Sequence, residues 1–364
     1  MADSNLWAAV PPQFWSVVFL SFGCIVGSLL NVCIHRMPRG ESIVTPRLHC
    51  PHCRYSIPWY LNIPLVTWLY LGGKCSHCKA PISFRYFLVE LLTGVVFLSC
   101  WLAFGIDAPA LALVYCLLLA GFIVATFIDV EHFIIPDEIT LGGVVVGFIC
   151  SGLVPSLPGA ATGAQGLEQS FYGILAGAGL IYGILRLGKL LFGRQIVELA
   201  PGTKVVFTET TLNYSDQEIP YEELFYRKSD AILLHAKTVE LVDRCYQDCA
   251  VRLTPVTLKI GEEQFDPDTV RHLEAVTDEI VLPREAMGLG DVKFMAAIGA
   301  FLGWQAVIFS LTVSAVIGAI VGVGLIACRK QEWSSRLPYG PYIALAATIW
   351  IFAHQQILSW WMGR

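Results

Sequence analysis

Long apolar stretches constrain the fold of this chain more than any other feature of its sequence. About 20 consecutive apolar residues suffice for a helix to cross the hydrocarbon core of a bilayer. Such stretches lie at residues 14–34, 86–106, 108–129, 138–157, 171–192, 286–304, 307–327 and 339–360. Only 15% of the residues are charged, against about 25% in an ordinary soluble domain. The pattern predicts an all-α polytopic membrane protein with about eight transmembrane helices.

Polar segments between these stretches divide the chain into its expected parts. These are a first span (1–34), a loop (35–85), spans two to five (86–194), a soluble insert (195–284) and the last three spans (285–364). The insert has seventeen acidic and nine basic residues, and alternating runs at 204–208, 232–241 and 251–260 predict strands. Residues 266–277 have the pattern of a capped helix. We expect a small α+β or β-rich domain.

Basic residues in the loops predict the orientation, because cytoplasmic loops are enriched in lysine and arginine. The loop 35–85 contains Arg36, Arg39, Arg47, Arg54, Lys74, Lys79 and Arg85, and the loop before the last span contains Arg329, Lys330 and Arg336. Loops on the other face have almost none, so both termini are expected outside and the insert in the cytoplasm. The apolar stretch 57–71 is short and holds two prolines, which favours an interfacial or re-entrant segment. A net charge of −5 gives no reason to expect a nucleic acid partner.

Two aspartates fall at the predicted cytoplasmic ends of spans. Asp129 ends the third span, and Asp291 opens the sixth within Gly288-Leu-Gly290-Asp-Val-Lys293. An ionisable side chain at a span is energetically costly, which makes it a candidate functional group. Each residue alone could equally be a helix cap. Both together, with glycines that let a substrate backbone approach Asp291, favour an aspartic site in which two carboxylates share one proton.

Neighbouring charged residues are weaker candidates for the same site. Lys293 follows Asp291 by two residues and could bias the pair of carboxylates electrostatically, or extend to the interface. Asp137 follows Pro136 and is interpreted either as a supporting acid of the active site or as the N-cap of the fourth span. Glu131 is expected to be a solvated carboxylate at the interface.

Four cysteines in the first loop form two C-x-x-C pairs. Cys50 and Cys53 are followed, after 21 residues, by Cys75 and Cys78, a spacing slightly longer than the commonest one in zinc ribbons but within reach of it. Two tight turns can bring four thiolates to one tetrahedral zinc, and a cytoplasmic loop disfavours disulfides. We expect a closed structural Zn²⁺ site; four reduced thiols without metal are the alternative. His49, His52 and His77 are reserve ligands.

Three sequence blocks, together with the cysteines, resemble the bacterial type IV prepilin peptidases, which are membrane aspartic proteases with a Gly-x-Gly-Asp motif. The blocks are Gly27–Arg36 (GSLLNVCIHR), Asp129 with the following Ile135–Thr140 (IPDEIT), and Gly288–Lys293 (GLGDVK). The resemblance implies that Asp129 and Asp291 are catalytic and that prepilins and pilin-like proteins are cleaved at the cytoplasmic face of the inner membrane. It also implies N-methylation of the new N-terminal residue with S-adenosylmethionine.

The position of the methyl-transfer site is open from sequence, since no glycine-rich nucleotide motif follows a strand. The resemblance associates methyl transfer with the loop 35–85. Glu90 lies about one turn inside the second span and is a candidate for cofactor binding, or else a partner of the helix dipole. Two other function classes fit paired acids in a membrane protein: a proton-coupled carrier and a non-enzymatic pilus or secretion assembly scaffold.

Overall fold

The computed structural model describes residues 11–45, 49–50, 52–192, 194–215, 217–225, 230–241, 244–270, 272–283, 288–328 and 337–361. They form two compact units, one of Met1–Tyr182 with Leu289–Arg364 and one of Gly183–Gly288. The basic residues Arg47, Arg329, Lys330 and Arg336, used above for the orientation, lie outside the described residues.

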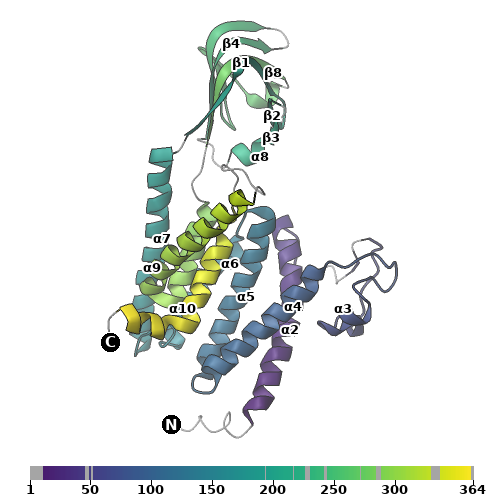
Figure 1. The fold of residues 1–364 in the computed structure, drawn as a ribbon, viewed down its shortest axis with the longest axis vertical. Coiled ribbons are helices and arrows are strands. Elements are labelled where there is room, and N and C mark those ends of the chain that lie inside the picture. Colours follow the sequence, from purple (N-terminus) through teal and green to yellow (C-terminus); the bar gives the residue numbers. More distant parts are fainter. Residues whose placement is uncertain are drawn as a thin grey trace. The chain divides into compact units, whose positions relative to one another are not determined.

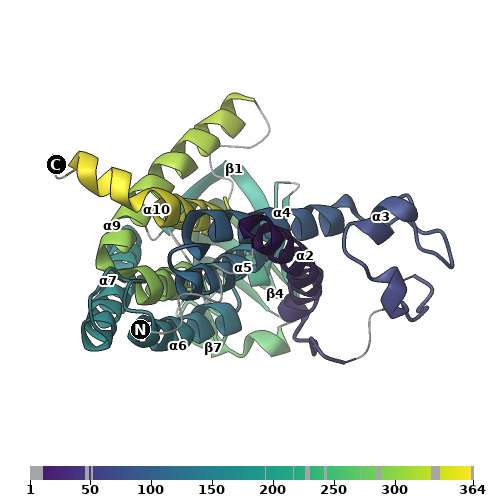
Figure 2. The same ribbon diagram turned by 90° about the horizontal axis from the view of Figure 1, so that it is seen from below.

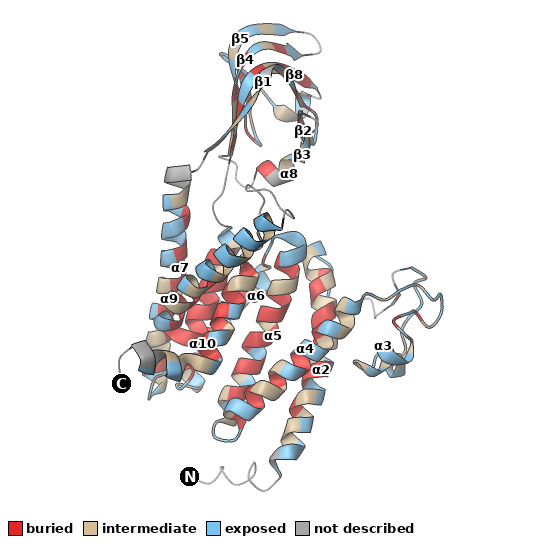
Figure 3. Ribbon diagram, in the orientation of Figure 1, coloured by how far each residue is buried: buried red, intermediate tan, exposed pale blue. Residues whose placement is uncertain are grey.

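Helices make up the first unit (Figure 1). They are α2 (Pro12–Arg36), α3 (Val66–Tyr70), α4 (Phe84–Cys100), α5 (Pro109–His132), α6 (Asp137–Leu153), α7 (Gly163–Phe192), α9 (Leu289–Ala327) and α10 (Gly340–Trp361). Alpha-helices satisfy their own backbone hydrogen bonds, as a hydrocarbon environment requires. Figure 3 shows buried residues concentrated along α5 and the first half of α9.

Five helices among the described residues are long and apolar enough to cross a membrane. Their bounds are Gln13–Arg39, Phe84–Gly105, Pro109–His132, Gly163–Gly188 and Leu289–Ala327. The predicted count of eight spans is therefore not confirmed. The fourth predicted span is the short helix α6, which has 17 residues. The element α9 consists of two helices that meet at Gly303, where φ of 79° and ψ of 176° are not helical, and they lie at the positions of the sixth and seventh predicted spans.

Glycines let neighbouring helices approach closely. A Cβ on Gly23 would lie 2.8 Å from the Gly94 Cα, and a Cβ on Gly27 would lie 2.7 Å from the Glu90 Cα. Helix α2 therefore packs directly on α4, and Figure 2 shows the two side by side. Gly173 of α7 and Gly299 of α9 meet backbone to backbone in the same way. Small residues at helix contacts are the usual means of association within a bilayer, where lipid is as apolar as the side chains.

The second unit is a single antiparallel sheet with the strand order β3-β2-β1-β8-β4-β5-β6-β7. Its strands are β1 (Arg194–Phe207), β2 (Thr211–Tyr214), β3 (Gln217–Pro220), β4 (Ile232–Leu241), β5 (Cys245–Leu253), β6 (Leu258–Ile260), β7 (Glu263–Phe265) and β8 (Leu273–Pro283), with a short helix, α8 (Tyr221–Leu224). Buried side chains of the strands form one hydrophobic core that includes Val205, Leu234, Val251 and Ile280. The alternating runs at 204–208 and 232–241 fall on β1 and β4, as predicted. The run at 251–260 is not a single strand, because it contains the end of β5, the turn from Thr254 to Thr257 and β6.

The predicted helix at 266–277 is wrong. Pro267–Thr269 form one 3-10 turn, and Leu273–Pro283 form the strand β8. Residues of β8 alternate between core and surface up to Thr277, and the strand lies between β1 and β4 at the centre of the sheet. Pairing on both sides outweighs the local helix-start pattern, because β-structure depends on context more than helix propensity does.

The two halves of the sheet repeat each other. Val205 pairs with Tyr214 between β1 and β2, and Val251 pairs with Ile260 between β5 and β6, each partner lying 46 residues further along the chain. The turns repeat as well: Thr211 N donates to Thr208 Oγ1 at 2.9 Å, and Thr257 N donates to Thr254 Oγ1 at 2.9 Å. The strand order is accordingly symmetric about the β8–β4 pair, which indicates an internal duplication.

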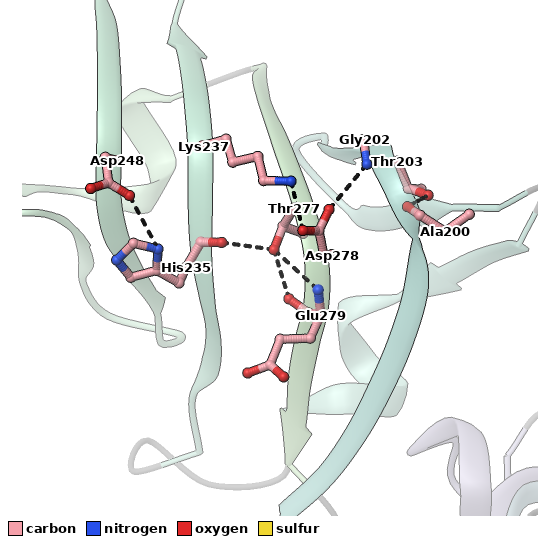
Figure 4. Close-up of polar contacts among 9 residues, drawn as sticks. All are labelled: Ala200, Gly202, Thr203, His235, Lys237, Asp248, Thr277, Asp278 and Glu279. Carbon is pink, nitrogen blue, oxygen red and sulfur yellow. Dashed lines mark hydrogen bonds and ion pairs between the residues drawn. The ribbon is translucent and has the colours of Figure 1, made fainter.

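A polar network covers the junction of β1, β8 and β4 (Figure 4). The register of β1 against β8 shifts between Glu198 and Thr203, and the amide of Gly202 in this bulge donates to Asp278 Oδ1 at 3.1 Å. Lys237 Nζ lies 2.6 Å from Asp278 Oδ2. The hydrogen bond from Lys237, followed by that from Gly202, lowers the pKa of the Asp278 carboxyl below its ordinary value.

Candidate active site and candidate metal site

Asp129 lies in the last turn of α5, and its side chain is 5% exposed. The helix ends because Phe133 adopts a left-handed conformation with φ of 54° and donates its N–H to the Asp129 carbonyl at 2.9 Å. The carboxylate of Asp129 receives a separate hydrogen bond, from the backbone N–H of Gly340 to Oδ2 at 2.8 Å. A buried carboxylate with an amide donor is thus held in one orientation.

Asp291 lies in the first turn of α9 and is 8% exposed. A carboxylate in the first turn of a helix is stabilised by the helix dipole. Asp291 interacts electrostatically with Tyr339, whose hydroxyl forms a 2.9 Å hydrogen bond with Ser314 of α9. The residue before α10 is therefore tied to the second helix of α9, which follows Gly303.

The start of α10 contacts Asp129 through the Gly340 amide, and the residue before it, Tyr339, interacts electrostatically with Asp291. A Cβ on Gly340 would lie 2.8 Å from Asp129 Oδ2 and 3.2 Å from Ile135 Cδ1, so any larger residue at this position would displace the Asp129 carboxylate or the start of α10. Ile135 also lies 3.5 Å from the Cβ position of Gly290. The loop after α5 thus packs on the glycine beside Asp291.

Sequence reasoning missed Tyr339 and Gly340. The available signal was Pro338-Tyr-Gly-Pro341, a turn followed by a proline at the start of an apolar run, which marks a helix start. Such a pattern does not say which side chain the helix start will meet, and Gly340 acts through its backbone alone.

The weaker candidates form ion pairs beside the aspartates. Lys293 Nζ lies 2.6 Å from Asp137 Oδ1 and joins the first turns of α9 and α6. Pro136, not Asp137, is the N-cap of α6, so the N-cap reading of Asp137 is wrong by one residue, since the fixed φ of proline starts the helix. Glu131 pairs with Arg85 at the start of α4. Gly288 is exposed and directly precedes α9.

The four cysteines of the first loop converge. Their Sγ atoms all lie within 4.8 Å of one another, and the Sγ atoms of Cys50 and Cys78 are 3.8 Å apart. A zinc ion with four Zn–S bonds of about 2.3 Å gives tetrahedral S···S edges of roughly 3.8 Å. The set Cys50, Cys53, Cys75 and Cys78 therefore fits a tetrahedral Zn²⁺ ion.

Two equivalent turns present these thiols. Cys50 N donates to the Tyr55 carbonyl at 3.0 Å, and Cys75 N donates to the Ala80 carbonyl at 2.8 Å. The residue after each pair, Arg54 or Lys79, has a positive φ, of 55° and 59°.

Backbone amides of the second turn also act on the thiols. The N–H groups of Cys78 and His77 lower the pKa of the Cys75 thiol to about 6, which favours the thiolate that binds metal. The ring of His77 stacks on Tyr55 at 5.1 Å between centroids.

Glu90 lies in the second turn of α4 and reaches into the first loop. Its Oε2 accepts a hydrogen bond from the backbone N–H of Leu65 at 2.8 Å, and its carboxylate also bonds Ser28 of α2. These contacts join α2, α4 and the segment of the loop that leads into α3.

Comparison with known proteins places this architecture in a family. A model described as "Bacterial Peptidase A24 N-terminal domain" matches residues 21–104, and a model described as "Type IV leader peptidase family" matches residues 116–200 and 272–323. The chain belongs to the type IV leader peptidase family. The interruption of the second match at 201–271 falls within the β-sheet unit, whereas both aspartates lie in matched segments.

Relatives of the chain have similar length. The protein named "Prepilin leader peptidase/N-methyltransferase" from Aeromonas hydrophila is 29% identical over 378 aligned positions, covering 97% of this chain and 95% of the relative. The protein of the same name from Pseudomonas aeruginosa is 27% identical, with coverages of 96% and 94%. The one from Myxococcus xanthus is 44% identical over 150 positions, or 40% of this chain and 43% of the relative. No solved structure matches the chain.

Proposed function

We propose that this chain is a membrane aspartic endopeptidase that removes the leader peptide of type IV prepilins and pilin-like proteins and N-methylates the new N-terminal residue. The relatives that cover nearly the whole chain carry the corresponding name. The observation that carries the proposal is the burial of Asp129 and Asp291 in a last and a first helical turn, with Gly340 bonded to Asp129 and the neighbouring Tyr339 interacting electrostatically with Asp291. The inner membrane, with the site at the cytoplasmic face, agrees with the basic first loop.

In the proposed reaction the two carboxylates share one proton. One carboxylate takes a proton from the attacking water, while the other donates a proton to the carbonyl oxygen of the scissile peptide. The amide of Gly340 fixes the orientation of the Asp129 carboxylate. Gly290 beside Asp291 packs against Ile135, which lies 3.5 Å from the Cβ position of this glycine.

The first loop is assigned to the second activity. S-adenosylmethionine would supply the methyl group, and the acceptor is the amine that leader cleavage releases. The cysteine set would hold a structural Zn²⁺ ion, because all four positions of the tetrahedron are occupied by sulfur and none is open to a substrate. Glu90 supports this part of the chain by bonding the Leu65 amide, so we assign it to positioning the loop.

Substitution of each aspartate by asparagine tests the protease directly. Asp129→Asn and Asp291→Asn should each lower leader removal by about 10³-fold or more, since general acid–base groups contribute 10²–10⁴ in rate. Asp107→Asn, an exposed aspartate in the turn before α5, serves as the matched control and should cleave normally. The product is weighed by mass spectrometry with a purified prepilin.

The outcomes separate the three function classes. Loss of cleavage with normal protein level supports the protease. Normal cleavage by both variants would remove the aspartates from the mechanism. A carrier would instead lose proton-coupled flux, and a scaffold would lose neither activity. Adding S-adenosylmethionine should increase the product mass by one methyl group, and a pre-cleaved pilin should accept the methyl group in both variants.

A further inference from the structure

Apolar side chains form an exposed stripe on the first loop. Ile63, Val66 and Leu69 are 46%, 59% and 62% exposed. Val66 and Leu69 are three residues apart and lie on one side of α3, and Ile63 lies in the turn that leads into this helix, where Thr67 N donates to the Ile63 carbonyl at 3.1 Å. Tyr60 and Tyr70 flank the stripe at 55% and 83% exposure. We refer to Ile63, Val66 and Leu69 as the loop stripe.

A hydrogen bond fixes the height of the loop stripe along α4. Glu90 Oε2 accepts from Leu65 N at 2.8 Å, and Glu90 is the seventh residue of α4, about 9 Å along the axis from Phe84 at 1.5 Å per residue. Helix α4 is one of the candidate membrane spans, Phe84–Gly105. The loop stripe therefore begins beside the second turn of a span, not in the polar part of the loop.

The backbone at this tether is strained. Leu65 has φ of 60° and ψ of −50°, and Val66 N donates to the Pro64 carbonyl at 2.6 Å, which closes a three-residue γ-turn. A residue other than glycine in such a conformation costs about 1–3 kcal/mol and persists only where the surroundings impose it. The bond to Glu90 and the prolyl residue before the turn impose it here, so the placement of the loop stripe is specified.

Aromatic packing determines which side of α3 faces outward. The Trp68 ring packs on Phe84 and Phe87 of α4, with centroid distances of 5.6 and 5.3 Å, and Trp68 Nε1 donates to the Ile82 carbonyl at 3.4 Å. Figures 1 and 2 show α3 beside the start of α4. Since Trp68 occupies the inner side, the loop stripe points away from the helices.

The charge of the loop suits an anionic lipid surface. Residues 36–85 hold seven basic residues and one acidic residue, Glu41. Of the basic residues, Arg54, Lys74 and Lys79 are exposed. Anionic headgroups attract basic segments near the membrane by about 1 kcal/mol for each lysine or arginine. An apolar stripe with aromatic flanks and nearby cations is the composition of a segment that lies in the bilayer interface.

We propose that the loop stripe docks on phospholipid at the boundary of headgroups and acyl chains, so that the membrane holds the zinc-binding loop in place. The proposal goes beyond leader cleavage and methyl transfer and does not depend on either. A second protein chain on the same stripe is the competing occupant. A photoreactive group at position 69 would form adducts with lipid in the first case and with a protein in the second.

Photo-crosslinking of the full-length protein in phospholipid nanodiscs identifies the occupant. Leu69→p-benzoylphenylalanine should form adducts with lipid acyl chains, which mass spectrometry detects on the intact protein. His52→p-benzoylphenylalanine, at an exposed position of the zinc-binding turn, should give at least tenfold fewer lipid adducts. Equal lipid adducts at both positions, or adducts of Leu69 with a protein, would overturn the proposal.

A second variant tests the docking without a probe. Val66→Glu with Leu69→Glu should detach the segment and raise trypsin cleavage after Lys74 about tenfold in nanodiscs, with zinc content unchanged as the folding control. Asn62→Glu, an exposed polar position on the same segment, should be cleaved at the rate of the unmodified protein. Unchanged protection of Lys74 in the double variant would show that lipid does not cover the loop stripe.

Discussion

Replacement of Gly340 by alanine disturbs Asp129 through a contact whose geometry is known. A Cβ at this position would lie 2.8 Å from Asp129 Oδ2 and 3.2 Å from Ile135 Cδ1. The first distance is shorter than any ordinary contact of a methyl group, so the carboxylate or the start of α10 must move. Such a movement lengthens or breaks the 2.8 Å hydrogen bond from Gly340 N to the same oxygen.

The size of the effect follows from the bond that is lost. A hydrogen bond to a charged group contributes about 1.5–3 kcal/mol. Since 1.36 kcal/mol in a barrier is a factor of ten, Gly340→Ala should lower the kcat of leader removal by roughly 10- to 150-fold. The KM should change little, because the substitution alters the orientation of a carboxylate and not a surface that binds the leader. Methyl transfer to a pre-cleaved pilin should remain unchanged.

The assay measures kcat and KM with purified enzyme and one prepilin, with cleavage and methylation followed separately by mass. Gly142→Ala is the matched control, since a Cβ at Gly142 of α6 has no neighbour within 4 Å, and it should retain kcat within twofold. A Gly340→Ala enzyme that cleaves like the control, while Asp129→Asn is inactive, would refute the role of the amide in orienting the carboxylate.

The remaining predictions concern the metal site and the β-sheet unit. Cys50→Ser should reduce bound zinc in the purified protein from one equivalent to less than a tenth, measured by mass spectrometry of the metal, whereas Cys245→Ser, an exposed strand cysteine, should keep it. The lowered pKa of Asp278 stabilises the folded sheet at pH values above its unfolded pKa of about 3.9, and this contribution is lost as the pH falls through the lower folded value. Lys237→Met should therefore weaken the acid dependence of amide exchange in β8, and an unchanged dependence would contradict the assigned pair.

Hydropathy located the helices because burial in lipid requires nearly continuous apolar sequence. Their number is not confirmed. Gly303, with φ of 79° and ψ of 176°, separates the two helices of α9 where the sixth and seventh spans were predicted to meet. The 17 residues of α6 span only about 26 Å at 1.5 Å per residue, so its apolar composition alone does not make it a full span.

The β-sheet unit shows what local patterns omit. Alternation identified β4 because its residues from Ile232 to Lys237 face core and surface in turn, before the pattern shifts at Thr238. The repeat of 46 residues is visible in the sequence as V-x-x-T-x-x-T-L at 205–212 and again at 251–258, although the paired positions Tyr214 and Ile260 share only an apolar character. The register of strand pairs preserves the repeat where the side chains have diverged, because a one-residue slip would turn the core face outward.

In the candidate active site, likewise, the sequence reveals the side chains that could react but not the backbone group that positions one of them. Asp129 and Asp291 are detectable in sequence because charge at the end of an apolar run is rare and costly. Gly340 is not detectable in this way. It contributes a backbone N–H group, which every residue except proline has, and its lack of a Cβ allows the close approach to Asp129. Its value depends on α10 starting beside the end of α5, 211 residues earlier in the chain. A sequence motif therefore identifies the carboxylates that are proposed to react, whereas only the fold identifies the amide that orients one of them.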